Sequence, residues 1–405
     1  MTARKPGRHA LAFVLVTILI DTIGFGIIIP VIPELIMDLS GEPISAAAGY
    51  GGMILFSFAA AHFIFAPVMG NLADRFGRRP ILLISLLALG IDYLIMAFAP
   101  SLFWLFLGRI FAGMFGATLA TANAYVTDVS PPEKRAQNFG LTGAAWGLGF
   151  IIGPVIGGFL GEMGPRIPFF VAAGVAFINV AYGFLVLPET LKDQDRRTFE
   201  WKRANPIGAL AHFRAYPVLL GLAGATILFQ LAHDANPAVF TYFAIHQFGW
   251  GEREIGFALS FVGVTVIFSQ TVLIRWTVSQ FGEVNSAFIG LAVAAIGFAA
   301  LGMATTAWMA YLALIPVALM GLAMPAIRSL MTARVPDNAQ GELQGALSSL
   351  KGLTMIAAPL LMTQLFRTFT AEDTPLHLPG APYFAAAFLM ISAALVLTRY
   401  ARNNS

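Results

Sequence analysis

The chain has 405 residues, of which 58% are hydrophobic and 11% are charged, and its mean hydropathy is +0.77. A soluble globular chain carries about 25% charged residues, so this composition excludes an ordinary soluble protein and indicates an integral membrane protein. The pI is about 9.2, but the formal net charge of only +3 gives no reason to expect a nucleic-acid partner. The chain has no cysteine, which excludes disulfides and thiolate metal sites, and we expect no metal or other cofactor.

Apolar segments of spanning length, which need about 20 residues each, occur twelve times along the chain. They cover residues 10–37, 49–69, 81–99, 102–127, 137–161, 168–187, 215–245, 252–276, 284–304, 307–332, 341–368 and 381–400. The longest polar interruption lies near the middle of the chain and is interpreted as a cytoplasmic linker. The sequence therefore predicts an all-α membrane protein of twelve transmembrane helices. These form two pseudo-symmetric six-helix bundles, at 1–187 and 214–405, joined by the linker 188–213.

Basic residues are distributed unevenly between the predicted loops. Eighteen of the 24 Lys and Arg residues fall on one side of the membrane, and three fall on the other. Cytoplasmic loops carry the excess of positive charge, so both termini are expected in the cytoplasm. The basic start resembles a signal peptide, but the apolar run continues from Leu11 to Met37 without a small-residue cleavage site. That run is therefore interpreted as the first span.

The two halves look like repeats at an offset of 205 residues. At this offset Gly51 matches Gly256, Phe76-Gly77 matches Phe281-Gly282, and Gly140 matches Gly345. Two proline pairs, Pro131 with Pro336 and Pro154 with Pro359, match at the same offset. Chance glycine matches are common in a chain with 40 glycines, so the prolines carry most of this inference. Repeats of this kind predict two halves of similar helical structure.

Between the second and third spans lies the stretch 70–80, with the order G-x-L-A-D-R-x-G-R-R. The residues of interest in it are Gly70, Asp74, Arg75, Gly77, Arg78 and Arg79. Gly70 would let two helix ends approach closely, and Gly77 suits the positive φ of a tight turn. Asp74 can cap a helix start or hold an arginine. The three arginines are typical of a cytoplasmic loop, and charge alone would indicate nothing more.

The order of residues in this stretch resembles the signature of the major facilitator superfamily, whose members are twelve-helix secondary transporters. The resemblance implies that Asp74 and the arginines brace the two halves in one state of the transport cycle. The second copy, around Gln280-Phe281-Gly282-Glu283, lacks the Asp and the arginines. The two halves are therefore expected to be inequivalent.

Two further motifs lie inside predicted spans. Gly149, Gly153 and Gly157 are spaced by four, with Pro154 and Gly158 beside them, and such small residues let helices pack closely. The same pattern resembles the antiporter motif of drug/proton exchangers.

A charge, Arg109, stands in the fourth span and is followed by Gly113. A charge at that depth must face the bundle interior and have a partner. The pattern R-x-x-x-G resembles a family motif whose arginine is linked to proton transfer, and a purely structural role remains open.

Two acids, Asp21 and Asp92, are flanked by apolar residues in the first and third spans. Desolvation favours the protonated form of a carboxyl group, which is what a proton-coupling residue needs. The alternative is a polar group that is simply satisfied inside the bundle.

At these residues the resemblance narrows to the tetracycline-efflux subfamily. It is carried by the segments 19–26, 30–33, 92–100, 325–327 and 340–345. The second half departs from that pattern at positions where the subfamily has functional polar residues. These positions are Val266, where the subfamily has a histidine, Ala294, where it has an aspartate, and Arg328, Lys351 and His233-Asp234. The resemblance thus implies drug export, but the departures predict weak or no transport of tetracycline.

The expected substrate cavity contains residues from both halves, namely Asn123, Gln230, His233, Asp234, Arg328 and Lys351. Arg328 is the repeat equivalent of Asn123, and at least one of the cations Arg328 and Lys351 is expected to contact Asp234. The sequence gives no support for an enzyme. It contains no phosphate-binding glycine loop, no G-x-S-x-G motif and no closely spaced His pair that could hold a metal.

We therefore expect a proton-coupled exporter of a small amphipathic compound in a bacterial-type inner membrane. Its partners are protons, the substrate and the bilayer, and it is expected to be a monomer. Two alternatives remain open: an organic-anion transporter of the same fold, and a non-transporting receptor or assembly partner.

Overall fold

The computed structural model describes residues 9–201, 208, 217–336 and 339–401. These residues form helices and no strand, which confirms the predicted all-α fold class. The part of the predicted linker at 202–207 and 209–213 lies outside the described residues. Large apolar side chains on the outside of the helices are exposed, for example Phe98, Leu185 and Phe388. Such surfaces are rare on soluble monomers and fit contact with lipid.

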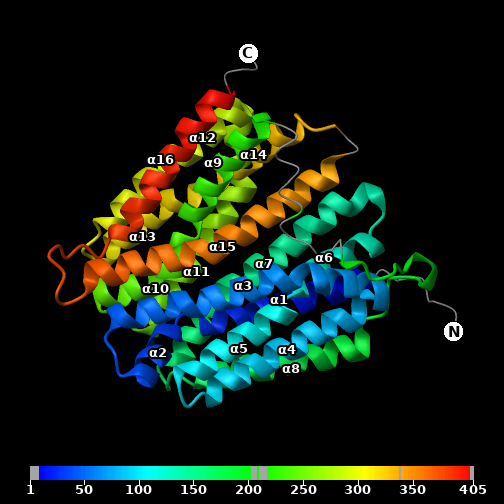
Figure 1. Ribbon diagram of the computed structural model, residues 1–405, viewed down its shortest axis with the longest axis horizontal. Coiled ribbons are helices and arrows are strands. Elements are labelled where there is room, and N and C mark those ends of the chain that lie inside the picture. The colour runs from blue at the N-terminus through cyan, green and yellow to red at the C-terminus, as the bar shows by residue number, and fades with distance from the viewer. Residues whose placement is uncertain (1–8, 202–207, 209–216, 337–338, 402–405) are drawn as a thin grey trace. The chain divides into compact units, whose positions relative to one another are not determined.

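The described residues of the first half include the α-helices α1 to α8 and the 3₁₀-helices η1 and η2, and Figure 1 labels the α-helices. They are α1 (His9–Ile28), α2 (Ile32–Ser40), α3 (Ile44–Phe76), α4 (Arg78–Phe98), α5 (Leu102–Phe115), α6 (Thr118–Val129), η1 (Pro132–Lys134), α7 (Arg135–Gly161), α8 (Ile167–Val186) and η2 (Asp193–Asp195).

The second half forms α9 (Pro217–His233), α10 (Ala235–Phe248), α11 (Glu252–Phe268), η5 (Ser269–Leu273), α12 (Ile274–Gly302), α13 (Ala307–Ala318), η6 (Leu319–Leu322), α14 (Ala323–Thr332), α15 (Gln340–Thr370) and α16 (Ala381–Ala401). The element η5 is one turn of π-helix.

Ten helical segments of the described residues are long and apolar enough to cross a membrane. One of them, Glu252–Gly302, has 51 residues and covers two predicted spans, which separate at the non-helical Gly282. The predicted span 215–245 corresponds to α9 and α10, which are too short to count singly. Each of the twelve predicted spans therefore corresponds to one or more helices of the structure.

The break between α9 and α10 falls at Asp234 and has a local cause. Pro237 has no amide proton to donate to the carbonyl oxygen of His233, and its ring crowds that carbonyl. The helix is interrupted there, and Asp234 stands at the N-cap of α10 without a side-chain cap hydrogen bond.

The chain divides into two compact units. The first comprises Met1–Ser40, Ser57–Asn205 and Gly251–Ser260, and the second comprises Gly41–Phe56, Pro206–Trp250 and Phe261–Ser405. Each unit thus includes a short helical segment from the other half of the chain. The domain bounds predicted from chain order alone stay a prediction.

Within the first unit, α1 packs along α7 and α8, and α4 packs on α5, α6 and α8. A buried core that includes Val14, Leu82, Tyr125 and Ala145 joins α1, α4, α6 and α7. Within the second unit, α12 and α9 pack on α16, and α15 packs on α9 and α10. Each unit therefore has its own helix-to-helix core.

The internal repeat is visible in the helix boundaries. The helices α5, α6 and α7 begin at residues 102, 118 and 135, and α13, α14 and α15 begin at 307, 323 and 340. Each pair differs by the predicted offset of 205. Gly77 and Gly282 also correspond, and both have positive φ, of 110° and 76°. A positive φ strains any side chain with a Cβ, so glycine is required at the same turn in both halves.

The stretch 70–80 is more helical than predicted. Instead of a loop, α3 continues to Phe76 and α4 begins at Arg78, so Gly77 alone makes the turn. The expected close approach at Gly70 is wrong, because a Cβ there would meet nothing within 4 Å. The positive φ expected at Gly77 is confirmed.

Candidate functional site

The centre of the first unit contains an ion pair between Asp92 on α4 and Arg109 on α5. The Asp92 side chain is 0% exposed and the Arg109 side chain 7% exposed. Apart from each other, the two groups have no hydrogen-bond partner among the described residues. Both charges are therefore compensated by one contact in an apolar surrounding, and the expected partner of Arg109 is identified as Asp92.

Small and aromatic neighbours hold this pair in place. A Cβ at Gly108 would lie 2.7 Å from Asp92 Oδ1 and 3.2 Å from Ile95 Cγ2, so a larger residue there would displace the Asp92 carboxylate. The guanidinium of Arg109 lies over the ring of Phe58 on α3, with Cζ 5.8 Å from the centroid. Such a cation–π contact favours the charged arginine.

The second predicted acid, Asp21, lies on α1 in the same unit. Its Oδ1 is buried and has no hydrogen-bond partner among the described residues. No ion pair within the described residues joins it to Arg109. Of the three predicted proton-coupling residues, the structure thus pairs Asp92 with Arg109 and leaves Asp21 separate.

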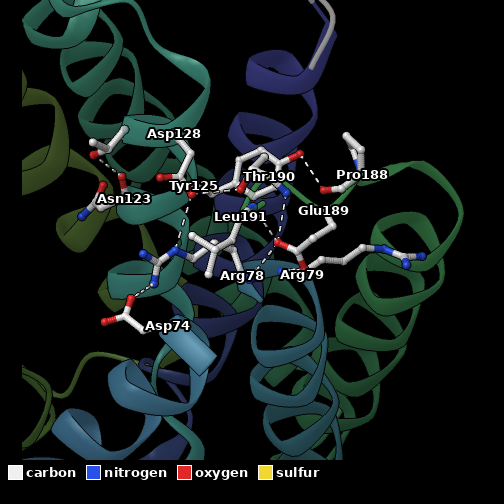
Figure 2. A network of polar contacts seen from close by, with 11 residues as sticks. Asp74, Arg78, Arg79, Asn123, Tyr125, Asp128, Pro188, Glu189, Thr190 and Leu191 are labelled. Atoms are coloured by element: carbon white, nitrogen blue, oxygen red, sulfur yellow. Dashed lines mark hydrogen bonds and ion pairs between the residues drawn. The ribbon is translucent and has the colours of Figure 1, made fainter. Parts of the chain in front are cut away.

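The predicted signature residues form a polar network at the turn between α3 and α4 (Figure 2). Asp74 accepts a hydrogen bond from Arg78 Nη1 at 2.6 Å, so Asp74 holds an arginine as predicted. Arg78 also pairs with Asp128 of α6 at 3.5 Å, and the Thr190 hydroxyl donates to Asp128 at 3.0 Å. The network ties α3, α4 and α6 to the chain after α8.

The guanidinium groups of the two remaining arginines of the signature lie over aromatic rings. Arg75 Cζ lies 5.0 Å from the centroid of the Phe76 ring, and Arg79 Cζ lies 5.5 Å from that of Phe184. The predicted role of these residues in bracing the two halves stays a prediction.

Glu189, just after α8, caps the start of α4. Its Oε1 accepts from the backbone amides of Arg78, Thr190 and Leu191 at 2.9, 2.9 and 3.0 Å, and its Oε2 accepts from that of Arg79 at 3.3 Å (Figure 2). The first amides of a helix have no partner within it, and Gly77 at the N-cap has no side chain to offer. A carboxylate here also matches the positive end of the helix dipole.

Replacing Glu189 by Gln should lower stability by about 1–2 kcal/mol, because the amide loses the charge that the four N–H groups face. The measurement is the thermal midpoint of the purified protein in detergent. Glu133→Gln is the matched control, because Glu133 is exposed. Equal midpoints for the two variants would contradict the capping role.

The predicted glycine face of α7 packs against α1. A Cβ at Gly149 would lie 2.7 Å from Thr22 Cβ, and one at Gly153 would lie 2.7 Å from the carbonyl oxygen of Ile23. Gly157 is still closer to the backbone of Ile27. The close packing predicted from the spacing is confirmed.

The two other residues of that motif also lie in tight contacts. A Cβ at Gly158 would lie 2.6 Å from the carbonyl oxygen of Glu252, and the Pro154 ring lies 2.8 Å from where a Cβ of Gly26 would be. The antiporter role of the motif stays a prediction.

The second unit contains a small cavity of about 20 Å³. Its lining residues come from α9, α14 and α15 and are Thr226, Ile227, Gln230, Met324, Arg328, Leu347, Leu350, Lys351 and Thr354. Three of the six predicted cavity residues, Gln230, Arg328 and Lys351, thus share one cavity. Asn123 lies in the first unit, on α6, and its predicted place in the same cavity stays a prediction.

The expected contact between Asp234 and a cation is wrong. Asp234 Oδ1 accepts from Gln230 Nε2 at 2.9 Å and lies 2.8 Å from His233 Nδ1. Neither Arg328 nor Lys351 forms an ion pair with any described residue within 4.0 Å. Gln230 and His233 lie one turn and one residue away and contact Oδ1, whereas the buried Oδ2 has no hydrogen-bond partner among the described residues.

Comparisons with known proteins agree with this architecture. Residues 14–359 match the model of the Major Facilitator Superfamily. The chain belongs to the major facilitator superfamily. Relatives in this superfamily include the Tetracycline resistance protein, class C, of Escherichia coli, 37% identical over 89% of this chain and 90% of that one. The Tetracycline resistance protein, class H, of Pasteurella multocida is 35% identical over 95% of this chain and 96% of that one.

Solved structures of transporters share the fold. The nucleoside transporter NupG aligns with a TM-score of 0.80 at 14% identity, covering 96% of this chain and 99% of that chain. The human organic anion transporter MFSD10 aligns with a TM-score of 0.72 at 21% identity, covering 97% and 100%. The chain is therefore a multi-pass membrane protein of the major facilitator superfamily, and the two relatives named above are tetracycline resistance proteins.

Sequence reasoning missed two parts of the site. Glu189 and Asp128 complete the network around Arg78, and Phe58 covers Arg109. A signal for Glu189 exists in Pro188-Glu189-Thr190, an acid directly after a span and on the same predicted side as the arginines. No comparable signal marks Phe58 in a chain with 35 phenylalanines.

Proposed function

We propose that the protein is a proton-coupled secondary transporter that exports a small amphipathic compound by alternating access. The buried Asp92–Arg109 pair carries this proposal, because charges at membrane depth are costly and mark proton and substrate pathways. Membership of the major facilitator superfamily and similarity to drug-resistance proteins support the same function.

Protonation of Asp92 would couple the proton to conformation. A protonated Asp92 no longer compensates Arg109, and an uncompensated buried charge is strongly unfavourable. The proton-loaded protein would therefore favour a state in which Arg109 reaches water or another acceptor. Release of the proton would restore the pair, and Asp21 offers a second carboxyl group in the same unit for the proton's path.

We place the protein in a bacterial inner membrane. The distribution of basic residues supports an orientation with both termini on the cytoplasmic side. We expect the transporter to act as a monomer, without an enzymatic step and without a nucleic-acid partner.

The direct test is flux of a compound panel into inverted membrane vesicles, measured with and without a proton gradient. At least one amphipathic compound should accumulate only when the gradient is present, and an uncoupler should abolish the accumulation. A non-transporting receptor of the same fold would show no gradient-dependent flux for any compound. Flux that is restricted to acids and independent of the proton gradient would instead indicate an organic-anion transporter.

Tetracycline tolerance should rise weakly or not at all when the protein is expressed in a susceptible bacterium. Val266 and Ala294 stand where the subfamily has a histidine and an aspartate, and Ala294 is fully buried on α12. Growth inhibition is measured across magnesium concentrations, with the Asp92→Asn variant at matched expression as the control. A strong, magnesium-dependent rise in tolerance would show that the substituted positions are dispensable.

A further inference from the structure

The cavity of the second unit presents two cations together. Arg328 is on α14 and Lys351 is on α15, and both line the cavity with Gln230. Lys351 is the twelfth of the 31 residues of α15, about 16 Å along the helix at 1.5 Å per residue. It therefore lies well inside the span, where an ammonium group needs a partner or a wet cavity.

No acid within the described residues supplies that partner. Neither cation has an ion pair there, and Asp234 is held by Gln230 and His233 instead. The helical spans of the second unit thus leave two positive side chains without a local counter-charge.

Arg328 and Lys351 are the charged donors of this cavity, whereas the Thr226 and Thr354 hydroxyl oxygens and Gln230 Oε1 can only accept. The Thr226 hydroxyl donates to the carbonyl oxygen of Leu222 at 2.8 Å, and the Thr354 hydroxyl donates to that of Lys351 at 2.9 Å. The Gln230 amide already donates to Asp234. Arginine and lysine side chains are donors only. The group that complements them must therefore be rich in acceptors, as a carboxylate or another oxyanion is.

The fold itself does not require these cations. At the repeat offset of 205, the positions equivalent to Arg328 and Lys351 are Asn123 and Trp146, which are uncharged. The helices of the first half form with neutral side chains at the same places. The two positive charges therefore occur only in the second copy of the repeat, where they line the cavity.

We infer that this cavity is the subsite for an anionic head group, a carboxylate or related oxyanion, on the transported compound. Its volume of about 20 Å³ leaves room only for a small charged group, so the apolar part of the compound lies outside it. The link to a transported compound rests on the proposed function, whereas anion binding can be measured without transport.

The test is equilibrium binding to the purified full-length protein in detergent, without a proton gradient. The ligands are built on three different ring systems. Each ring system is tested in three forms, which are the carboxylate, its methyl ester and the matching ammonium compound. In at least one ring system the carboxylate should bind about ten-fold more tightly than both others, which corresponds to about 1.4 kcal/mol. Arg328→Gln and Lys351→Gln should each remove this preference, and Lys351→Arg should keep it.

Arg334→Gln is the matched control, because it removes one positive charge just beyond α14 at a residue that does not line the cavity. It should retain the preference. Absence of a carboxylate preference in every ring system would overturn the inference, as would equal loss in the Arg334 variant. If inorganic phosphate alone competes as well as the organic carboxylates, the ligand is a small inorganic anion and the assignment to the substrate is wrong.

Vesicle flux separates this inference from the proposed function. Proton-driven export without any carboxylate preference would leave the function standing and refute the anionic subsite. A carboxylate preference that depends on both cations, without gradient-driven flux, would support the subsite and refute the exporter.

Discussion

Replacing Asp92 by Asn should abolish proton-driven transport and destabilise the protein by about 3–5 kcal/mol, the cost of leaving a buried charge unpaired. Arg109 would lose its carboxylate partner while its side chain stays 7% exposed between α3, α4 and α5. An amide at position 92 also cannot bind and release a proton in the physiological range. Gradient-driven flux in vesicles and the thermal midpoint in detergent measure the two effects separately.

A second variant separates stability from coupling. Asp92→Asn combined with Arg109→Gln removes both charges, so folding should largely recover while proton-driven flux stays absent. The surface pair Asp38–Arg166, at 3.7 Å with side chains 54% and 36% exposed, is the matched control. Asp38→Asn should cost less than about 1 kcal/mol, because exposed pairs contribute little. Full proton-driven flux in the Asp92→Asn variant would remove this pair from the mechanism.

Replacing Gly157 by Ala should separate α1 from α7 and destabilise the first unit by about 1–3 kcal/mol, or prevent insertion altogether. The added Cβ would collide with the carbonyl oxygen and Cα of Ile27. Backbone atoms within a helix cannot turn aside as a side chain can, so one whole helix must move. Monodispersity after detergent extraction and the thermal midpoint report the loss.

The same helix provides the control for this change. A Cβ at Gly143 would meet nothing within 4 Å, so Gly143→Ala removes a glycine from α7 without a clash. Because alanine is a better helix former than glycine by about 1 kcal/mol, this variant should be neutral or more stable. Gly157→Ala and Gly143→Ala therefore have opposite expected signs, and a Gly157→Ala protein as stable as the Gly143→Ala protein would refute the packing argument.

The sequence by itself determined the features that depend on neighbouring residues. Apolar run lengths predicted every span, because a helix in the bilayer must satisfy its own backbone over about 20 residues. The offset of 205 predicted equal helix starts, and Gly77 and Gly282 show the positive φ that only glycine takes easily. The spacing of Gly149, Gly153 and Gly157 predicted a face for close packing.

Only the tertiary structure decided which polar groups meet. Glu189 reaches the amide of Arg78 across 111 residues of chain, and Asp92 reaches Arg109 on the next helix. The sequence predicted a cation as the partner of Asp234, whereas Asp234 Oδ1 contacts Gln230 and His233. A membrane helix that contacts lipid on one side and neighbouring helices on the opposite side is apolar on both. Hydropathy therefore does not reveal which side faces inward. The rotation of each helix about its axis, set by packing against its neighbours, selects the pairs.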